Sequence, residues 1–473
     1  MRKRAKVWKS TAWLVLCAAL AACSSGNDGK ETNGSPAPGD NSAKTEDGKT
    51  VISMSVLTSD RFLMEAEQKF EQLHPDIDVQ INELVPADTS GGGKIVMMQG
   101  AETGPKPEDV DKYASSVNAA LMSGNASDII SAEYLPIDKY IEKGLLGDWD
   151  EWASKDGSFN KTDYYEKVMS GVSGGEGWFG VPTSFSLDVM LGDDSLLEQN
   201  SLNDATWTWD QFVDLLAKTK TDGKYGMSMI KPETLLKYVT ESVYAQLVKK
   251  EGNNVSFDEQ AFRAYMEKVK KLYDEGLATP EMMGPENTAF RLLSMDSPMN
   301  ALLMPQMEGK SKAMLTPPAS GTDEGLPFKS SQVLALNEKS DVKEAAWTFV
   351  SYLLSEEMQS SRAMMNFPVN KAALANGLAS TKEMIEGGGN GEGGKKASIR
   401  LRGKDGEEMT PTISEEDMAR VTALMPEVGK YANIDSKVLS MISEESAAYF
   451  TGGKSADAVA KSLSNRINTY LNE

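Results

Sequence analysis

The chain from residue 51 onward alternates strand-like and helix-like patterns of apolar side chains. Residues 51–57 alternate apolar and polar positions, which predicts a β-strand, and residues 62–73 repeat apolar side chains at helical spacing. A second apolar run at residues 79–81 predicts another short strand. A strand, a helix and a strand in this order favour a parallel sheet in an α/β domain. The apolar positions of the first strand and of the helix are Ile52, Met54 and Val56, then Phe62, Ala66, Phe70 and Leu73.

Three later segments have the spacing of amphipathic helices. The first stops before Gly276, a residue type that often ends helices, and Ser455 opens the third as a preferred N-cap. Asp341 and Glu344 are spaced as a capping box at the start of the second. The three apolar stripes are Phe262, Met266, Val269 and Tyr273; Val342, Ala345, Phe349 and Leu353; and Val459, Leu463, Ile467 and Tyr470.

Composition narrows the possible functions. The 473 residues are 40% hydrophobic and 25% charged, which is typical of a folded chain with two or three domains. The net charge is -21, and no run of Lys and Arg is long enough to follow a phosphate backbone, so we expect no nucleic-acid partner. His74 is the only histidine, which excludes a cluster of several histidines around a metal. We expect neither a metal nor a cofactor.

The N-terminal residues have the pattern of a secretory signal. Five basic residues precede an apolar stretch over residues 11–22, which is shorter than the roughly 20 residues that span a bilayer. The stretch ends in LAAC at residues 20–23, which resembles the lipobox of bacterial lipoproteins. We therefore predict a signal peptide over residues 1–22 and lipid attachment at Cys23. Residues 23–49 bring no large apolar side chain after the cysteine, so we expect a flexible tether.

A glycine-rich segment at residues 387–394 invites comparison with a phosphate-binding loop. Gly389, Gly394 and Lys395 have the spacing of that loop, but Lys396 stands where the magnesium-binding Ser or Thr is needed. No apolar strand runs into the segment. We interpret it as a mobile surface loop.

Five blocks of sequence, taken together, resemble the extracellular solute-binding proteins of family 1. These are the receptor lipoproteins of ABC importers, typified by the maltodextrin-binding protein. Each block is a weak signal alone, but their order and spacing match the family over most of residues 51–473. The blocks are FEQLHPDIDV at 70–79, LMSGNASDII at 121–130, GWFGVP at 177–182, TWDQF at 208–212, and AAWTFV at 345–350 followed by LLS at 353–355.

The resemblance implies an α/β fold with two lobes, the type II arrangement of periplasmic binding proteins. Each lobe would be discontinuous, because the chain crosses between lobes through strands that form a hinge. By position, lobe one would comprise residues 50–186 and 330–370, and lobe two residues 187–329 and 371–473. A ligand that contacts both lobes stabilises the closed form, because the open form offers only part of the contacts.

The chain departs from the family pattern at two places. Leu191 and Gly192 replace the usual Tyr-Asn pair, and methionines crowd residues 282–314, where a block ending in Ala-Met is usual. Methionines can form an adaptable pocket, but they more often fill a core. Trp209 and Trp347 fall in family blocks that usually pack inside, so we expect both in the core.

The candidate ligand-binding residues of lobe one follow predicted strands, where open α/β sheets bind their ligands. Asp60 and Arg61 follow the first strand and could form charge-assisted hydrogen bonds with sugar hydroxyls. Asp60 could equally cap the following helix, and both roles are compatible. Glu133 and Tyr134 follow the strand around residues 128–130.

Ser184 and Phe185 stand where members of the family contact ligand or line the hinge. Core packing for Phe185 and a solvated position for Glu133 are the alternatives. In lobe two the candidates are Tyr244 and Phe328. Aromatic faces pack against the C–H face of a sugar, while carboxylates and hydroxyls bind its polar rim.

The resemblance implies a receptor without enzymatic activity that captures an oligosaccharide or a related carbohydrate. The expected partners are the transmembrane subunits of an ABC permease and, through the lipid anchor, the outer face of the cytoplasmic membrane. A monomer on a long tether suits a Gram-positive cell surface. Two alternatives stay open: a surface glycoside hydrolase, which would need a pair of facing carboxylates, and a sensory binding protein that presents its ligand to a membrane kinase.

Overall fold

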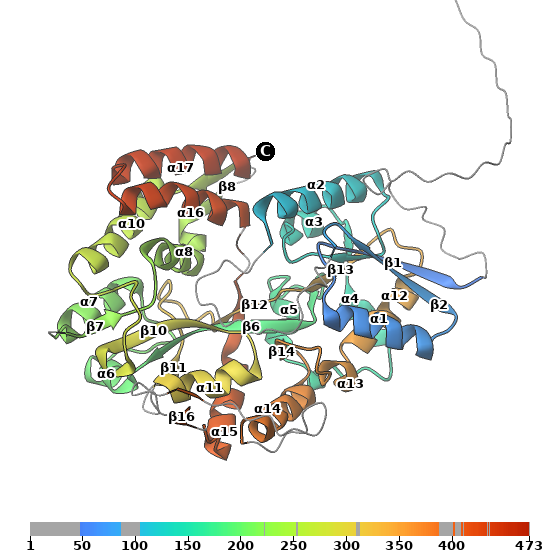
Figure 1. Cartoon of the computed structure of the whole chain (residues 1–473). Helices are drawn as coiled ribbons and strands as arrows, with labels where there is room; N and C mark the ends of the chain where they lie inside the picture. The colour runs from blue at the N-terminus through green and yellow to red at the C-terminus, as the bar shows by residue number, and fades with distance from the viewer. Residues whose placement is uncertain are drawn as a thin grey trace, which may run out of the picture. The chain divides into compact units, whose positions relative to one another are not determined.

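The computed structural model describes residues 48–86, 105–221, 223–251, 254–308, 313–386, 401–402, 408–409, 411–432, 434 and 436–472 (Figure 1). The expected signal peptide, Cys23 and nearly all of the tether lie outside the described residues, as does the glycine-rich segment at 387–394. None of the helices in the described ranges has the length and apolar character needed to cross a membrane.

One sheet is built from the N-terminal part of the chain and one later strand. Its strands are β1 (Thr50–Val56), β2 (Ile77–Glu83), β3 (Ile129–Ser131), β4 (Leu146–Gly147), β5 (Val181–Pro182) and β13 (Val333–Asn337). The order is β2-β1-β3-β13-β4, with β5 also paired to β13. β2 and β3 run parallel to β1, and β13 runs antiparallel to its neighbours. The predicted strand, helix and parallel strand are confirmed, with α1 (Arg61–Leu73) between β1 and β2.

We group the helices that occur along the chain between and after these strands with this sheet, and call the group the first lobe. They are α2 (Pro107–Ser123), α3 (Ile137–Glu142), α4 (Trp149–Lys155), η1 (Lys161–Asp163), α5 (Glu166–Gly171), α12 (Lys343–Leu353) and α13 (Glu356–Gln359). The helix predicted around Phe349 is confirmed as α12, but its capping box is wrong. Val342 holds the N-cap position with no side-chain cap, because its apolar side chain has no hydrogen-bond acceptor.

A second sheet is centred on the long strand β6. Its strands are β6 (Ser184–Gly192), β7 (Tyr225–Met227), β10 (Thr288–Met295), β11 (Ala313–Leu315), β12 (Leu326–Lys329), β14 (Phe367–Pro368) and β17 (Val428–Tyr431). The order is β17-β12-β6-β10-β7, with β11 and β14 also paired to β6. Two small antiparallel pairs are β8 (Val248–Glu251) with β9 (Asn254–Phe257), and β15 (Leu401–Arg402) with β16 (Glu408–Met409).

We group the remaining described helices with the second sheet, and call the group the second lobe. They are α6 (Asp194–Gln199), α7 (Trp209–Thr219), α8 (Pro232–Ser242), α9 (Tyr244–Leu247), α10 (Glu259–Asp274), η2 (Pro285–Asn287), α11 (Pro298–Glu308), α14 (Lys371–Ile385), α15 (Glu415–Leu424), η3 (Met425–Glu427), α16 (Ser436–Phe450) and α17 (Ala456–Leu471). The helices predicted before Gly276 and after Ser455 are confirmed as α10 and α17. Ser455 caps α17 by accepting the backbone N–H of Ala458 at 3.2 Å.

Among the described residues the chain passes between the two large sheets three times, and two of these crossings are short neighbouring segments; the third, between β13 and β14, contains α12 and α13. Thr183 joins β5 to β6, and residues 330–332 join β12 to β13. The two segments are hydrogen-bonded to each other, because the Thr183 N–H donates to the Gln332 carbonyl at 3.2 Å and the Thr183 hydroxyl to the Gln332 side chain at 2.9 Å. The side chain of Gln359 donates to the Thr183 carbonyl at 2.9 Å. These buried hydrogen bonds tie together the strands that connect the lobes.

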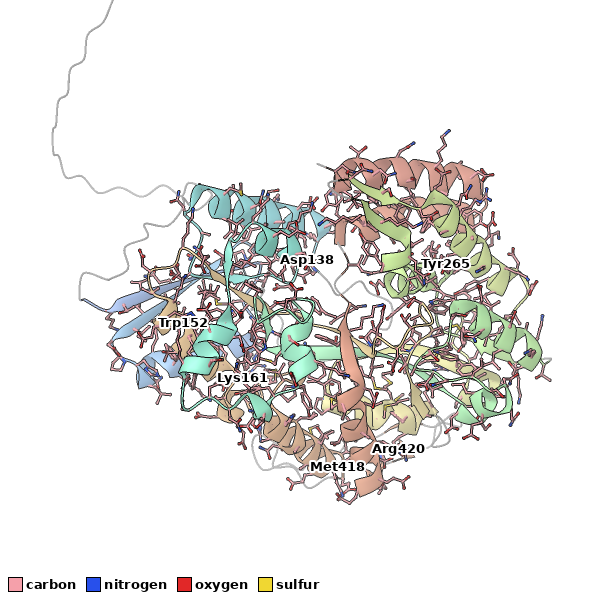
Figure 2. All side chains as sticks on the ribbon, turned by 180° about the vertical axis from the view of Figure 1, so that it is seen from behind. Asp138, Trp152, Lys161, Tyr265, Met418 and Arg420 are labelled. Atoms are coloured by element: carbon pink, nitrogen blue, oxygen red, sulfur yellow. The ribbon has the colours of Figure 1, made fainter. Side chains whose placement is uncertain are left out.

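Within the described ranges, the buried apolar side chains form three clusters. One lies in the first lobe around Tyr113 on α2, and another in the second lobe around Phe212 on α7. The third joins elements of both sheets, from Ile52 on β1 to Phe328 on β12. Figure 2, seen from behind, marks Trp152 on α4 and Tyr265 on α10, which pack against the shared and the second-lobe clusters respectively.

The methionines of residues 282–314 divide between core and surface. Met295 is fully buried in the shared cluster, and Met299, Met304 and Met314 pack against it. Met282 is 74% exposed. Most of these methionines therefore act as core fillers.

Candidate ligand-binding site

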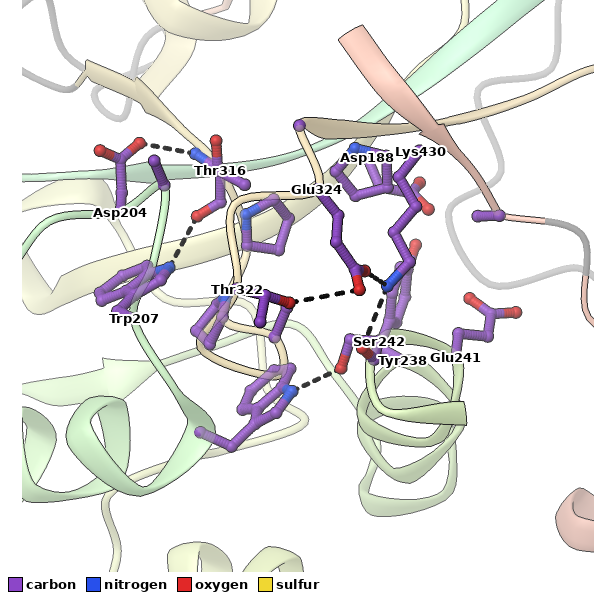
Figure 3. Close-up of a pocket in the computed structure, with 18 of the residues that line it drawn as sticks. Asp188, Asp204, Trp207, Tyr238, Glu241, Ser242, Thr316, Thr322, Glu324 and Lys430 are labelled. Carbon is purple, nitrogen blue, oxygen red and sulfur yellow. Dashed lines mark hydrogen bonds and ion pairs between the residues drawn. The ribbon is translucent and has the colours of Figure 1, made fainter. Parts of the chain in front are cut away.

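A pocket opens in the second lobe beside the ends of β11 and β17 (Figure 3). The cavity volume that a water-sized molecule can reach in it is about 40 Å³. The loop that follows β11 forms one wall, and α8 together with the start of α7 forms another. The side chains that line it are Asp188, Asp204, Trp207, Trp209, Tyr238, Glu241, Ser242, Leu292, Thr316, Pro317, Pro318, Thr322, Glu324, Pro327 and Lys430. The carboxyl ends of strands are where open α/β sheets bind ligands.

Hydrogen bonds from two tryptophans hold the walls of this pocket in place. The indole N–H of Trp207 donates to the Thr316 carbonyl at 2.9 Å, and the indole N–H of Trp209 donates to the Ser242 hydroxyl at 2.6 Å. Thr208 lies between them and starts α7 with a capping box to Gln211. This cap fixes where α7 begins, so the two rings have defined positions at the pocket wall. The rings are nearly buried, and their remaining surface faces the pocket.

A cluster of charges lies at the base of the pocket. Lys329 Nζ lies 2.8 Å from Asp188 Oδ2 and 3.0 Å from Glu241 Oε2, and it stands over the ring of Tyr238. Burial alone would lower the pKa of Lys329, but the two carboxylates outweigh burial and raise it, so this lysine is charged. Burial raises the pKa of the Tyr238 phenol as well. Lys430 pairs with Glu324 and lies 3.4 Å from the Ser242 carbonyl at the end of α8 (Figure 3).

The first lobe contributes a second group of polar side chains at the ends of β1 and β3. Glu133 follows β3, and its Oε2 accepts hydrogen bonds from the Ser131 hydroxyl at 2.6 Å and from the Val333 N–H at 3.3 Å. Burial is the largest cause that raises the pKa of Glu133 to about 7, and the nearby charge of Asp60 adds to it. Tyr431 on β17 of the second sheet also feels the charge of Glu133, which raises the tyrosine pKa further after burial. Glu133 thus lies near groups of both sheets.

The predicted residues Asp60, Arg61 and Tyr134 all reach solvent at least in part. Asp60 caps α1 by accepting the Leu63 N–H at 2.8 Å, and desolvation by the surrounding protein raises its pKa even though the side chain touches solvent. Arg61 is exposed in the first turn of α1. Tyr134 is half-buried, and burial followed by the charge of Glu133 raises its pKa to about 12. The geometry brings Asp60, Glu133 and Tyr134 into one neighbourhood.

The other four predicted residues lie in the protein interior or away from the pocket. Phe185 and Phe328 have no exposed surface and pack as rings against each other, at a centroid distance of 6.3 Å. In this conformation neither ring can contact a ligand. Phe185 packs in the core, which is the alternative to ligand binding that the sequence left open. Ser184 is 5% exposed at the start of β6. Tyr244 begins α9, packs against the second-lobe cluster and does not line the pocket.

Sequence reasoning missed most of the pocket. Asp188 sits within a strand, and Tyr238 and Glu241 sit on an ordinary amphipathic helix, so nothing in the local sequence marks them. Two features of the sequence could have indicated the pocket: the Trp-Thr-Trp triplet at residues 207–209 and the Pro-Pro pair at 317–318. Trp209 is in the core, as expected, and also lines the pocket.

A further pocket lies on the first lobe, away from the strand ends. Helix α12 and the segment around η1 line it, with polar side chains such as Asn160, Ser351 and Lys371. His74 also lines it, caps the end of α1 and stacks on Phe70 with ring centroids 4.4 Å apart. The described residues hold no cluster of His, Cys, Asp and Glu suited to a metal ion.

The topology and the site together define the class of two-lobed, type II periplasmic binding proteins. Solved structures share the fold over 89–90% of this chain. An extracellular solute-binding protein family 1 from Alicyclobacillus acidocaldarius matches with TM-score 0.53 and 18% identity over 99% of its own length. The sugar-binding protein MalE from Xanthomonas citri matches with TM-score 0.53 and 14% identity over 97%. A periplasmic oligogalacturonide binding protein from Yersinia enterocolitica matches with TM-score 0.51 and 12% identity over 99%.

The family follows from the sequence match. The model of the family described as bacterial extracellular solute-binding protein matches residues 97–386, which is more than half of the chain. The chain therefore belongs to this family. The family is one of binding proteins, and the resemblance found in the five sequence blocks is confirmed.

Proposed function

We propose that the protein is a lipid-anchored extracellular receptor that captures a carbohydrate and delivers it to the permease of an ABC importer. The observation that carries this proposal is the second-lobe pocket, which combines aromatic rings with buried carboxylates. Tyr238 supplies aromatic surface at the pocket wall, where Trp207 and Trp209 expose only 2% and 4% of their surface. Asp188 and Glu241 supply acceptors for the hydroxyls of a sugar. The names of the Xanthomonas citri and Yersinia enterocolitica neighbours describe sugar-binding proteins, which supports the same ligand class.

Capture would work by closure of the two lobes over the ligand. We propose lobe boundaries at 50–186 with 330–370 and at 187–329 with 371–473, and two of these bounds lie close to Thr183 and to residues 330–332, where the chain passes between the sheets. The start of β6 at residues 184–186 and β14 pair in the second sheet although these bounds place them in lobe one. Asp60, Glu133 and Tyr134 would be the first-lobe contacts of a ligand held in the second-lobe pocket. A ligand bound by both groups favours the closed form, which a permease could then recognise.

The anchor is a further part of the proposal. Lipid attachment at Cys23 and a tether to residue 49 would keep the receptor at the outer face of the cytoplasmic membrane, within reach of the permease subunits. We propose that the receptor acts there as a monomer. Intact-mass analysis of the membrane-extracted protein would show the diacylglyceryl group on Cys23, and an unmodified chain that still starts at Met1 would contradict the anchor.

A thermal-shift screen against neutral, amino and acidic sugars tests the ligand class. A ligand at 100 times its Kd adds about 2.7 kcal/mol to the stability of the folded state. Trp209→Leu should lose the ligand-induced shift, whereas Trp152→Leu, a half-buried tryptophan of the first lobe, should keep it. A shift with another solute but with no sugar would refute the carbohydrate assignment. Release of cleaved glycan during the assay would favour the glycoside hydrolase instead.

A further inference from the structure

The second-lobe pocket carries more carboxylates than cations. Among the described residues that line it, the acidic side chains are Asp188, Asp204, Glu241 and Glu324, and the basic one is Lys430. Lys329 adjoins the pocket through its ion pairs with Asp188 and Glu241. Asp204 Oδ2 accepts the Thr316 N–H at 2.9 Å, so backbone hydrogen bonding accounts for one of the four acids. Even with both lysines counted, negative charge is in excess.

Asp188 has an acceptor atom that the protein itself leaves without a donor. Its side chain is 5% exposed, and Oδ2 lies 2.8 Å from Lys329 Nζ. Oδ1 is buried and has no hydrogen-bond partner among the described residues. A buried carboxylate oxygen without a donor is unfavourable, and a ligand O–H or N–H could supply the missing hydrogen bond.

Both lysines near the pocket already form ion pairs with carboxylates of the protein. Lys329 lies between Asp188 and Glu241, and Lys430 pairs with Glu324 and lies 3.4 Å from the Ser242 carbonyl. A ligand carboxylate would have to displace one of these partners and would then face the remaining acids. Like charges in a partly desolvated pocket repel strongly. The pocket is therefore poorly suited to an anionic group.

We propose that Asp188 makes the pocket selective for sugars that present a neutral hydroxyl or a protonated amine, and that the pocket rejects acidic sugars. This inference rests on the proposed function and narrows its ligand class. The fold does not impose the preference, because a structural neighbour is described as an oligogalacturonide binding protein and oligogalacturonides are acidic. The charged side chains of this chain set the preference.

Calorimetric titration of the full protein tests the proposal with panels of neutral, amino and acidic oligosaccharides of matched length. We expect at least one neutral or amino sugar to bind ten or more times tighter than the acidic sugar of the same backbone. An acidic sugar that binds as tightly or tighter overturns the inference and leaves the receptor function standing. Absence of binding to all three panels overturns the inference together with the carbohydrate assignment.

Asp188→Asn tests the role of the residue itself. The asparagine keeps the shape of the side chain but removes its charge, so the Kd of the preferred sugar should rise about tenfold. The ratio of affinities between preferred and acidic sugar should shrink by a similar factor. Asp210→Asn is the matched control, because Asp210 is exposed on α7 and pairs with Lys268 on α10. An unchanged ratio in a folded Asp188→Asn variant, checked by its thermal unfolding without ligand, overturns the assignment.

Discussion

Glu133 gives the sharpest test of the electrostatics at the ends of β1 and β3. Burial raises its pKa from 4.5 to about 7, although the Ser131 hydroxyl and the Val333 N–H stabilise its charged form. A difference of about 2.5 pKa units corresponds to roughly 3 kcal/mol of free energy between the two protonation states.

Proton linkage gives the direction in which the stability of the folded protein changes with pH. The pKa of Glu133 is higher in the folded state than in the unfolded chain, so the folded state binds the proton more tightly. The carboxyl group therefore contributes stability that is present below pH 4.5 and is lost as the pH rises to about 7. Above that pH the charged carboxylate should cost the folded state up to about 3 kcal/mol.

Glu133→Gln removes this titration and keeps the hydrogen bonds, because the amide oxygen can accept from Ser131 and Val333. We expect the variant and the parent to be similarly stable near pH 4.5, and the variant to be more stable at pH 8 by up to about 3 kcal/mol. The measurement is chemical unfolding of the ligand-free protein between pH 4.5 and 8, expressed as the difference between the two proteins. Glu108→Gln, at an exposed site on α2, is the control. A stability difference that stays constant over this pH range would refute the reasoning.

Three further predictions concern the second lobe and the contact between lobes. Gly192→Ala should destabilise the protein by about 1–3 kcal/mol in chemical unfolding, because the added Cβ would overlap the Phe290 ring; Gly144→Ala meets no atom, so its cost should come from backbone strain alone. Lys329→Met should lower the free energy of unfolding by about 2–3 kcal/mol, because it leaves Asp188 and Glu241 without their cation. The loss is limited because the Lys329 side chain is about a third exposed. The surface variant Lys268→Met should lower the free energy of unfolding by under 1 kcal/mol. Lys437→Glu places a negative charge opposite Asp111, across the contact of α16 with α2. The variant should bind ligand a few-fold more weakly at low salt, and as tightly as the parent at 1 M salt, where the repulsion is screened. Equal weakening at both salt concentrations would contradict an ionic contact.

The local patterns of the sequence predicted the regular elements where one face of the element is buried. The period-two alternation at Ile52, Met54 and Val56 and the helical stripe of α10 each mark a buried face, and both elements form as predicted. The capping box at Asp341 is absent because α12 begins at Lys343, one residue later than a cap at Asp341 requires, so Val342 takes the N-cap position. Caps depend on the backbone path just before the helix, which the spacing of side chains does not fix.

The candidate site was only partly predictable, for a different reason. Asp60 and Glu133 could be found because they lie in the loops that follow β1 and β3, and the ends of these parallel neighbours meet at one edge of the sheet. Asp188, Glu241 and Lys329 could not be found from the sequence. Asp188 and Glu241 are 53 residues apart, Glu241 and Lys329 are 88 residues apart, and the three meet only when α8 packs beside β6 and β12. Phe185 and Phe328 were predicted to bind ligand and are fully buried, because the position of a residue in a strand does not show which face of the sheet is covered.

The sequence by itself determined the elements, the order of the five family blocks and hence the two-lobed class of binding protein. These properties depend on local periodicity and on residues close together in the chain. Only the tertiary structure decided which side of the second sheet carries the pocket and which carboxylate lacks a donor. Both depend on burial, and burial is set by elements that pack together from distant parts of the chain.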